Sequence, residues 1–129
     1  MLDQIEVRFT DVDSDGHVGH IPVIEWVAHS RVKFIDKKIK NAKLWKTIDY
    51  VLVNIKINFL KEIFYPGLIS VKVKSLKIGT KSITTKYQVF NAEIDDILAE
   101  ANCVNVFINY KTRTPINIPN ELREVLTIE

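Results

Sequence analysis

A change of hydrophobic period divides this sequence into one long helix and a set of strands. Between residues 21 and 40, apolar side chains recur at steps of three and four, which predicts an amphipathic helix. The predicted stripe consists of Ile24, Ala28, Val32, Ile35 and Ile39. At 1.5 Å per residue such a helix is about 30 Å long. The rest of the core must come from elsewhere in the chain, where the apolar period is two.

Strand patterns occupy most of the remaining sequence, and short polar connections join them. Apolar and polar residues alternate from 51 to 59, which predicts one dry and one wet face, and again over 69–73, 83–89 and 103–110. A short strand signal at 5–9 precedes the helix. Connections this short favour antiparallel neighbours over parallel crossovers. We therefore predict an α+β fold in one domain, residues 1–129, with the helix packed on one face of the sheet.

Composition narrows the class of protein. The chain has 129 residues, of which 47% are hydrophobic, enough for a substantial core. A net charge of +2 without a basic stripe argues against a nucleic-acid partner. The single cysteine, Cys103, allows neither an internal disulfide nor a zinc pattern, and we expect no metal or cofactor. The N-terminus lacks a signal-peptide pattern and no apolar run is long enough to span a membrane, so we expect a cytoplasmic protein.

The acidic loop before the helix holds the main candidates for chemistry. Asp13 could act as a general base or nucleophile, or it could merely cap a turn or the helix. For Asp11 and Asp15 we favour structural roles. Histidine is a common acid–base residue in proteins, so His17 and His20 could each serve as a base or as structural support. The N–H groups at the start of the helix could bind a developing negative charge.

Several motifs in order give the loop a more specific meaning. Residues 7–18, Val-Arg-Phe-Thr-Asp-Val-Asp-Ser-Asp-Gly-His-Val, resemble the opening motif of the 4-hydroxybenzoyl-CoA thioesterase family. Further resemblances follow at Arg31, at 57–60 with the turn 65–67, at 77–82 and at 117–122. The resemblance implies a hotdog fold, in which a five- to six-stranded antiparallel sheet wraps one long central helix. It also implies hydrolysis of acyl-CoA to free acid and CoA by a homodimer or homotetramer with active sites between subunits.

The resemblance also assigns roles to individual residues. It makes Asp13 the catalytic carboxylate, and it places the amide that polarises the thioester carbonyl near His20. Gly19 would let the substrate approach the backbone closely, and His17 would support the loop. The nucleotide of CoA would lie near the turn formed by Gly79, Thr80, Lys81 and Ser82.

Two departures from the family pattern keep other functions open. Gly19-His20 stands where members often carry Asn-Asn, and Ala28-His29 stands where many carry glutamate. A catalytic carboxylate on the helix is therefore not expected. The alternatives are a thioesterase that acts on acyl carrier protein and a non-catalytic hotdog protein that binds acyl thioesters.

Overall fold

The computed structural model describes residues 4–128. Its helical elements are η1 (Phe9–Asp11), a 3-10 turn, and the α-helices α1 (His20–Asn41) and α2 (Asn120–Val125). Its strands are β1 (Gln4–Glu6), β2 (Ile48–Phe59), β3 (Leu68–Ile78), β4 (Ser82–Asn91) and β5 (Asp96–Asn109). Neither α-helix in this part of the chain is long and apolar enough to cross a membrane.

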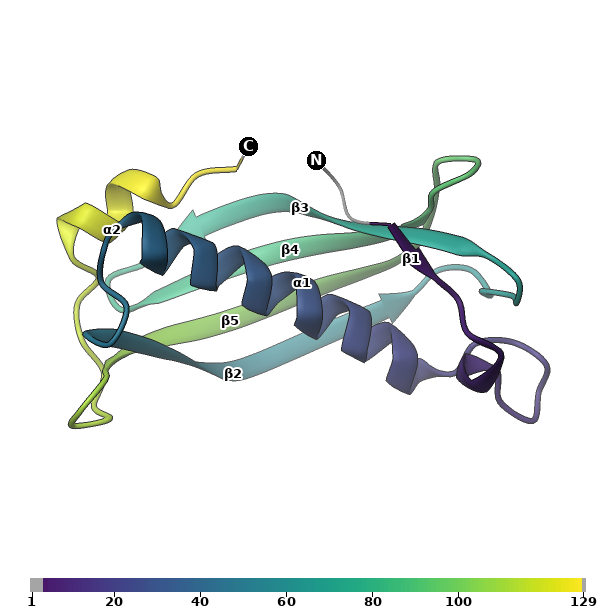
Figure 1. Ribbon diagram of the computed structural model, residues 1–129, viewed down its shortest axis with the longest axis horizontal. Coiled ribbons are helices and arrows are strands. Elements are labelled where there is room, and N and C mark those ends of the chain that lie inside the picture. Colours follow the sequence, from purple (N-terminus) through teal and green to yellow (C-terminus); the bar gives the residue numbers. More distant parts are fainter. Residues whose placement is uncertain (1–3, 129) are drawn as a thin grey trace.

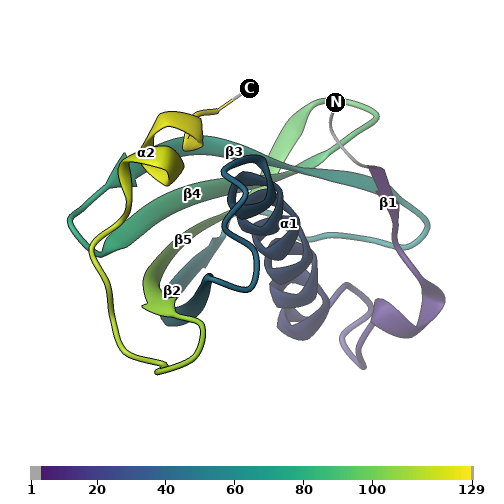
Figure 2. The same ribbon diagram turned by 60° about the vertical axis from the view of Figure 1, so that its left-hand side comes forward.

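The five strands form one antiparallel sheet in the order β1-β3-β4-β5-β2. The sheet curls around α1, which crosses its concave face (Figures 1 and 2). The predicted hotdog arrangement, with one long helix against an antiparallel sheet, is confirmed. The predicted helix, 21–40, differs from the observed one by a single residue at each end.

The stripe of α1 that faces the sheet differs from the predicted one. Val23, Trp26 and Val27 are at most 6% exposed, and Ile35 and Ile39 extend the buried stripe. Ile24 and Val32, which were predicted to be buried, are 39% and 40% exposed. The predicted stripe was right for Ile35 and Ile39 and wrong for Ile24 and Val32. Apolar residues cover more than one side of this helix, so periodicity alone could not select the side that meets the sheet.

A β-bulge also changes the predicted faces of β2. Leu52 pairs with Asn105, and the next ladder pair is Asn54 with Val104, so Val53 is left over as the bulged residue. Cross-strand partners share a face. Val51, opposite Val106, therefore lies on the other side of the sheet from Ile55, which is opposite Cys103. The single dry face predicted for 51–59 is thus interrupted in the middle of the strand.

Two apolar clusters make up the core, and polar side chains lie between them. One cluster contains Val23, Trp26 and Val27, and the other contains Ile35 and Ile39 with residues from β5 and α2. Between these groups on α1 is Arg31, which does not belong to the predicted stripe. Its Nε atom is buried and has no partner among the described residues.

The sheet contributes further polar groups to the interior. Thr85 and Asn105 are fully buried and come from β4 and β5. The hydroxyl of Thr85 donates a hydrogen bond to the hydroxyl of Tyr87 at 3.1 Å, and burial raises the pKa of Tyr87 to about 12. Neither the oxygen nor the nitrogen of the Asn105 amide has a partner within the described chain. An interior amide with no partner is unusual in a folded protein.

The outer edge of the sheet is formed by β2, and it is apolar and open. Val51, Leu52, Val53 and Ile55 are between 37% and 56% exposed. In folded proteins the unpaired edge of a long apolar strand is normally covered, either by another part of the same chain or by a second chain.

Candidate functional site

A tight loop between η1 and α1 carries Asp13. The backbones of Val12 and Val18 form a β-bridge, and the amide of Asp13 donates to the carbonyl of His17 at 3.0 Å. Gly16 turns the chain with a φ of 87°, a conformation that favours glycine. The loop thus closes like a miniature hairpin and fixes the backbone of Asp13.

The carboxylate of Asp13 lies beside the start of α1. Its Oδ1 atom accepts a hydrogen bond from the amide of Asp15 at 2.9 Å. Its Oδ2 atom would be 3.3 Å from a Cβ placed on Gly19, the N-cap residue of α1. A glycine is therefore favoured at position 19 because a side chain there would crowd the Asp13 carboxylate.

The N-terminus of α1 is a candidate for binding a negatively charged oxygen. The N-cap Gly19 has no side chain to cap the helix, and the first turn contains no acidic residue. The amide of Gly19 itself donates to the carbonyl of Asp11 at 3.2 Å. The partial positive charge of the helix end is thus not neutralised by a carboxylate of its own first turn.

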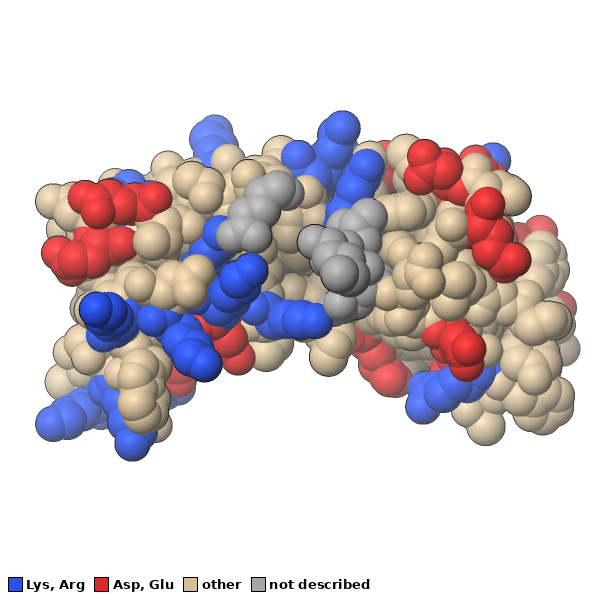
Figure 3. Space-filling view, turned by 45° about the horizontal axis from the view of Figure 1, so that its top comes forward, with Lys and Arg blue, Asp and Glu red and all other residues tan. Residues whose placement is uncertain are grey.

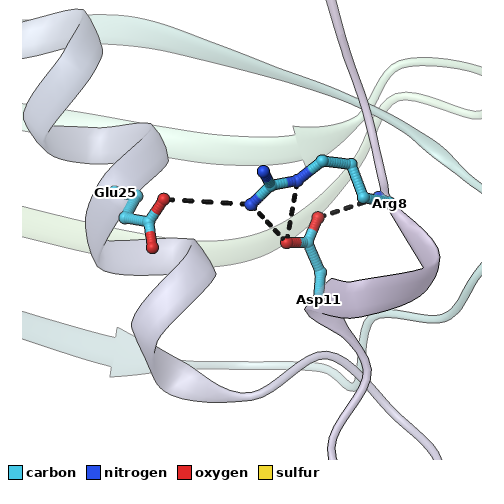
Figure 4. Close-up of polar contacts among 3 residues, drawn as sticks. All are labelled: Arg8, Asp11 and Glu25. Carbon is cyan, nitrogen blue, oxygen red and sulfur yellow. Dashed lines mark hydrogen bonds and ion pairs between the residues drawn. The ribbon is translucent and has the colours of Figure 1, made fainter.

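Asp11 is engaged in a different way from Asp13, as Figure 4 shows. It is 3% exposed, and its carboxylate accepts three hydrogen bonds from Arg8, one from the backbone amide and two from the guanidinium. The hydrogen bond with Asp11 raises the pKa of Arg8. The carboxylate of Asp11 is consequently committed to structure, as we expected from the sequence.

A cavity of about 380 Å³ lies in front of Asp13 and the helix start. Its polar lining comprises Asp13, His17, His20, Lys61 and Glu62. Its apolar lining comprises Val18, Val23, Phe59, Leu60 and Ile63. The three site residues predicted in this loop besides Asp13, namely His17, Gly19 and His20, all border this cavity. A carboxylate, a helix N-terminus and an apolar wall thus meet in one place.

Glu62 lines the cavity but was not predicted as a site residue from the sequence. The Nδ1 atom of His17 is 3.2 Å from Glu62, and the amine of Lys61 is 2.7 Å from Asp96. Lys61 and Glu62 follow the end of β2, more than 40 positions after the acidic loop, so no local pattern links them to it. The amide of Val18 donates to the carbonyl of Ile63 at 2.8 Å, and this bond and the contact between His17 and Glu62 bring the two segments together.

The aromatic residues Trp26, Phe34 and Trp45 do not line the cavity. Trp26 is buried in the core, Phe34 packs against the second apolar cluster, and Trp45 is 61% exposed. The aromatic side chain that lines the cavity is Phe59, at the end of β2. His29 is exposed on α1 and is not among the lining residues.

One group of side chains near the cavity has the composition of a metal site. Asp13, Asp15 and His17 each place one ligand atom within 4.8 Å of the others. These oxygen and nitrogen atoms suit a hard or borderline cation. Both aspartates are exposed, and exposed acidic groups often lie this close without a metal, so this spacing alone assigns none.

The predicted CoA turn lies at the opposite end of the molecule. Residues 79–81 connect β3 to β4, and the carbonyls of Gly79 and Thr80 accept hydrogen bonds from Arg123 of α2 at 2.8 and 3.1 Å. In Figure 1, α2 lies at the end of α1 remote from η1 and the acidic loop. The 22 residues of α1 span about 33 Å. One chain therefore does not bring the turn and Asp13 together.

Charge is distributed unevenly between these two ends. Lys and Arg side chains gather over the centre and lower left of the face in Figure 3, and a group of Asp and Glu side chains lies at its upper left. The opposite end, where the acidic loop lies, carries mainly Asp and Glu (Figure 3).

Comparison with known proteins identifies the group to which these features belong. The model of the thioesterase-like superfamily matches residues 7–126. The long-chain acyl-CoA thioesterase FadM of Escherichia coli is 26% identical over 129 residues, covering 98% of this chain and 96% of FadM.

Solved structures agree in fold. The probable thioesterase YbaW of Escherichia coli superposes with a TM-score of 0.82 at 24% identity and covers 98% of this chain and 96% of its own. The gentisyl-coenzyme A thioesterase BH1999 superposes with a TM-score of 0.79 at 16% identity, over 98% of this chain and 100% of its own.

Proposed function

Because the chain belongs to the thioesterase-like superfamily and is therefore a thioester hydrolase, we propose that it hydrolyses acyl-CoA with Asp13 as the catalytic carboxylate. The observation that carries this proposal is the position of Asp13. Its Oδ2 atom lies against Gly19 at the N-terminus of α1, at the border of a cavity with an apolar wall. An attacking group and a site for the developing oxyanion are thus adjacent.

The proposed reaction begins with the thioester carbonyl oxygen directed at the first amides of α1, near His20. As water attacks the carbonyl carbon, Asp13 accepts a proton from it, and the negative charge that forms on the carbonyl oxygen is stabilised by the helix end. The tetrahedral intermediate then collapses, the carbon–sulfur bond breaks, and the thiolate of CoA leaves and is protonated. The products are a free acid and CoA.

A nucleophilic route is the alternative for Asp13. The carboxylate would attack the thioester itself, release CoA and form a mixed anhydride, which water then hydrolyses. A single turnover in ¹⁸O-labelled water can identify the anhydride, provided that water attacks it at the Asp13 carboxyl carbon. Label incorporated into the Asp13 side chain would identify the anhydride, whereas a general base leaves Asp13 unlabelled and places one ¹⁸O in the product acid.

We further propose that the working enzyme is an oligomer. If the turn at residues 79–82 binds the nucleotide of CoA, it must serve the acyl site of another copy, because it lies about 33 Å along α1 from Asp13 in its own chain. The open apolar edge of β2 is a suitable surface for such a contact. Light scattering at assay concentrations should report a dimer or tetramer, and a monomer would contradict a shared site.

The activity test is a thiol-release assay against short, long and aromatic acyl-CoAs. Asp13→Asn is expected to lower turnover by about 10²-fold or more while the protein remains folded. Asp15→Asn, an equally exposed change in the same loop, is the matched control and should retain activity within about threefold. Equal activity in wild type and Asp13→Asn would refute the assignment. No release from any acyl-CoA would favour acyl carrier protein substrates or a binding role.

A further inference from the structure

Asp11 connects the strand before the acidic loop to the helix after it. On one side, the Asp11 carboxylate accepts hydrogen bonds from the amide of Arg8 at 2.8 Å and from its guanidinium at 2.8 and 3.2 Å (Figure 4). On the other side, the backbone carbonyl of Asp11 accepts the amide hydrogen of Gly19 at 3.2 Å. Asp11 therefore holds both ends of the loop formed by residues 12–18, the first end through the chain itself and the second through the bond from Gly19.

The guanidinium of Arg8 extends the connection to the body of α1. Its Nη2 atom lies 2.8 Å from Asp11 and 3.9 Å from Glu25, the sixth residue of α1 (Figure 4). The Asp11 carboxylate is buried, whereas Arg8 and Glu25 are largely exposed. A lysine could supply the charge of Arg8 but not its planar set of donors, so the geometry depends on arginine.

We infer that Arg8 and Asp11 are positioning residues for the proposed hydrolysis, which set the separation between the Asp13 carboxylate and the first amides of α1. Asp13 follows Asp11 by two residues, and Gly19 is held to Asp11 by a hydrogen bond. A shift of Asp11 therefore moves both the attacking group and the oxyanion site. Because Asp13 already lies close to Gly19, a small displacement alters their alignment, and misplacement by about 1 Å can cost about 10²-fold in rate.

The test compares Arg8→Lys with Arg113→Lys. The control makes the same chemical change at another exposed ion pair, in which Arg113 lies 2.7 Å from Asp49, away from the cavity lining. Arg8→Lys is expected to lower kcat by about 10-fold or more with KM within about twofold, because the groups that bind substrate are unchanged. Arg113→Lys should leave both constants within about twofold.

A double-mutant cycle distinguishes positioning from general support of the fold. If Arg8 acts through Asp13, the losses caused by Arg8→Lys and Asp13→Asn will not multiply, and the double variant will fall little below Asp13→Asn alone. Fully multiplicative losses, or a fall in kcat that follows a loss of folded protein, would overturn the inference.

Amide hydrogen exchange gives a readout that does not need activity. In Arg8→Lys the Gly19 amide should exchange about 10-fold faster, while the amides of Val27 and Ile35 in the buried part of α1 keep their wild-type rates. Unchanged exchange at Gly19, or faster exchange along all of α1, would refute the inference that Arg8 holds Gly19 in place through Asp11. If the wild-type protein hydrolyses no thioester, the proposed function fails, and the exchange measurement alone tests whether Arg8 and Asp11 hold the start of α1 in place. If Arg8→Lys does not fold, Asp11→Asn is measured in the same way.

Discussion

Replacing Asn105 by valine should stabilise the protein, although it removes a polar side chain from the interior. Asn105 is 0% exposed, and both polar atoms of its amide lack partners among the described residues. Folding therefore strips the amide of water without replacing the lost hydrogen bonds. Valine is β-branched, suits a strand and contains no polar atom to desolvate.

The magnitude follows from the cost of burying an unpaired amide. That cost is about 1–3 kcal/mol. Valine has one heavy atom fewer than asparagine, so little overpacking is expected, and we predict a gain of about 1–3 kcal/mol in the free energy of unfolding. For a chain of this length, that corresponds to a rise of about 3–10 °C in Tm.

Thr85→Val provides a matched comparison on the neighbouring strand. Thr85 is also 0% exposed, but its hydroxyl donates to the hydroxyl of Tyr87 at 3.1 Å. Removing it leaves a buried tyrosine hydroxyl without this bond, so we expect a loss of about 1–3 kcal/mol. The same kind of substitution should thus have opposite effects at two buried positions.

Urea unfolding measures both effects, and all variants are compared at one fixed protein concentration because the stability of any oligomer depends on concentration. The slope of free energy against urea should be unchanged in both variants. A loss of more than about 1 kcal/mol in Asn105→Val would refute the reasoning, since it would mean that the amide is hydrogen-bonded in solution, for example to a buried water.

Three further predictions concern other parts of the chain. Burial raises the pKa of Cys103, which is 0% exposed, so a thiol reagent at neutral pH should label it only as fast as the protein opens, and immediate labelling would contradict its burial. Burial alone would raise the pKa of Asp49, but hydrogen bonds from Arg113 and the Tyr50 amide lower it below the value in the unfolded chain. The ion pair of Asp49 with Arg113 therefore stabilises the protein above the unfolded pKa of Asp49, and this effect is lost as pH falls through the folded pKa. The Tm difference between wild type and Arg113→Gln should accordingly shrink from about pH 5 to about pH 2. A constant Tm difference would argue against this role of the ion pair. If the CoA turn serves another copy of a dimer, a 1:1 mixture of Asp13→Asn and Lys81→Ala chains should regain up to about a quarter of wild-type activity, because half of the dimers are mixed and each of those has one intact site of two; no recovery would argue against a site shared in this way.

The sequence predicted the main elements of the fold because their patterns are local. The period of the helix and the alternation in the strands each arise within a few neighbouring residues. The side of α1 that is buried could not be predicted in the same way. Ile24 and Val23 are adjacent and both apolar, and only the position of the sheet decides that Val23 is buried and Ile24 is 39% exposed.

In the candidate site, too, the residues that are neighbours in the sequence could be predicted and those brought together by the fold could not. Asp13, His17, Gly19 and His20 could be found together because they occupy one short loop and the helix start. Glu62 and Phe59 could not, because they reach the cavity through pairing between distant segments. Sequence order also gave no indication that residues 79–82 lie at the far end of α1 from Asp13, since that separation depends on how the helix and the paired strands are placed in the fold.

The bulge in β2 has a consequence for how relatives of this chain can differ in length. The ladder with β5 continues directly from Leu52 to Asn54, so Val53 is the one residue there without a cross-strand partner. A similar step in β3 passes from Val73 to Ser75 and omits Lys74. Deleting either omitted residue would preserve every remaining pair and leave each side chain on its present face. Elsewhere in these strands, the loss of one residue would turn the following side chains over. Gaps in alignments of related sequences should therefore collect at these two positions, where evolution can shorten a strand without exchanging its inside for its outside.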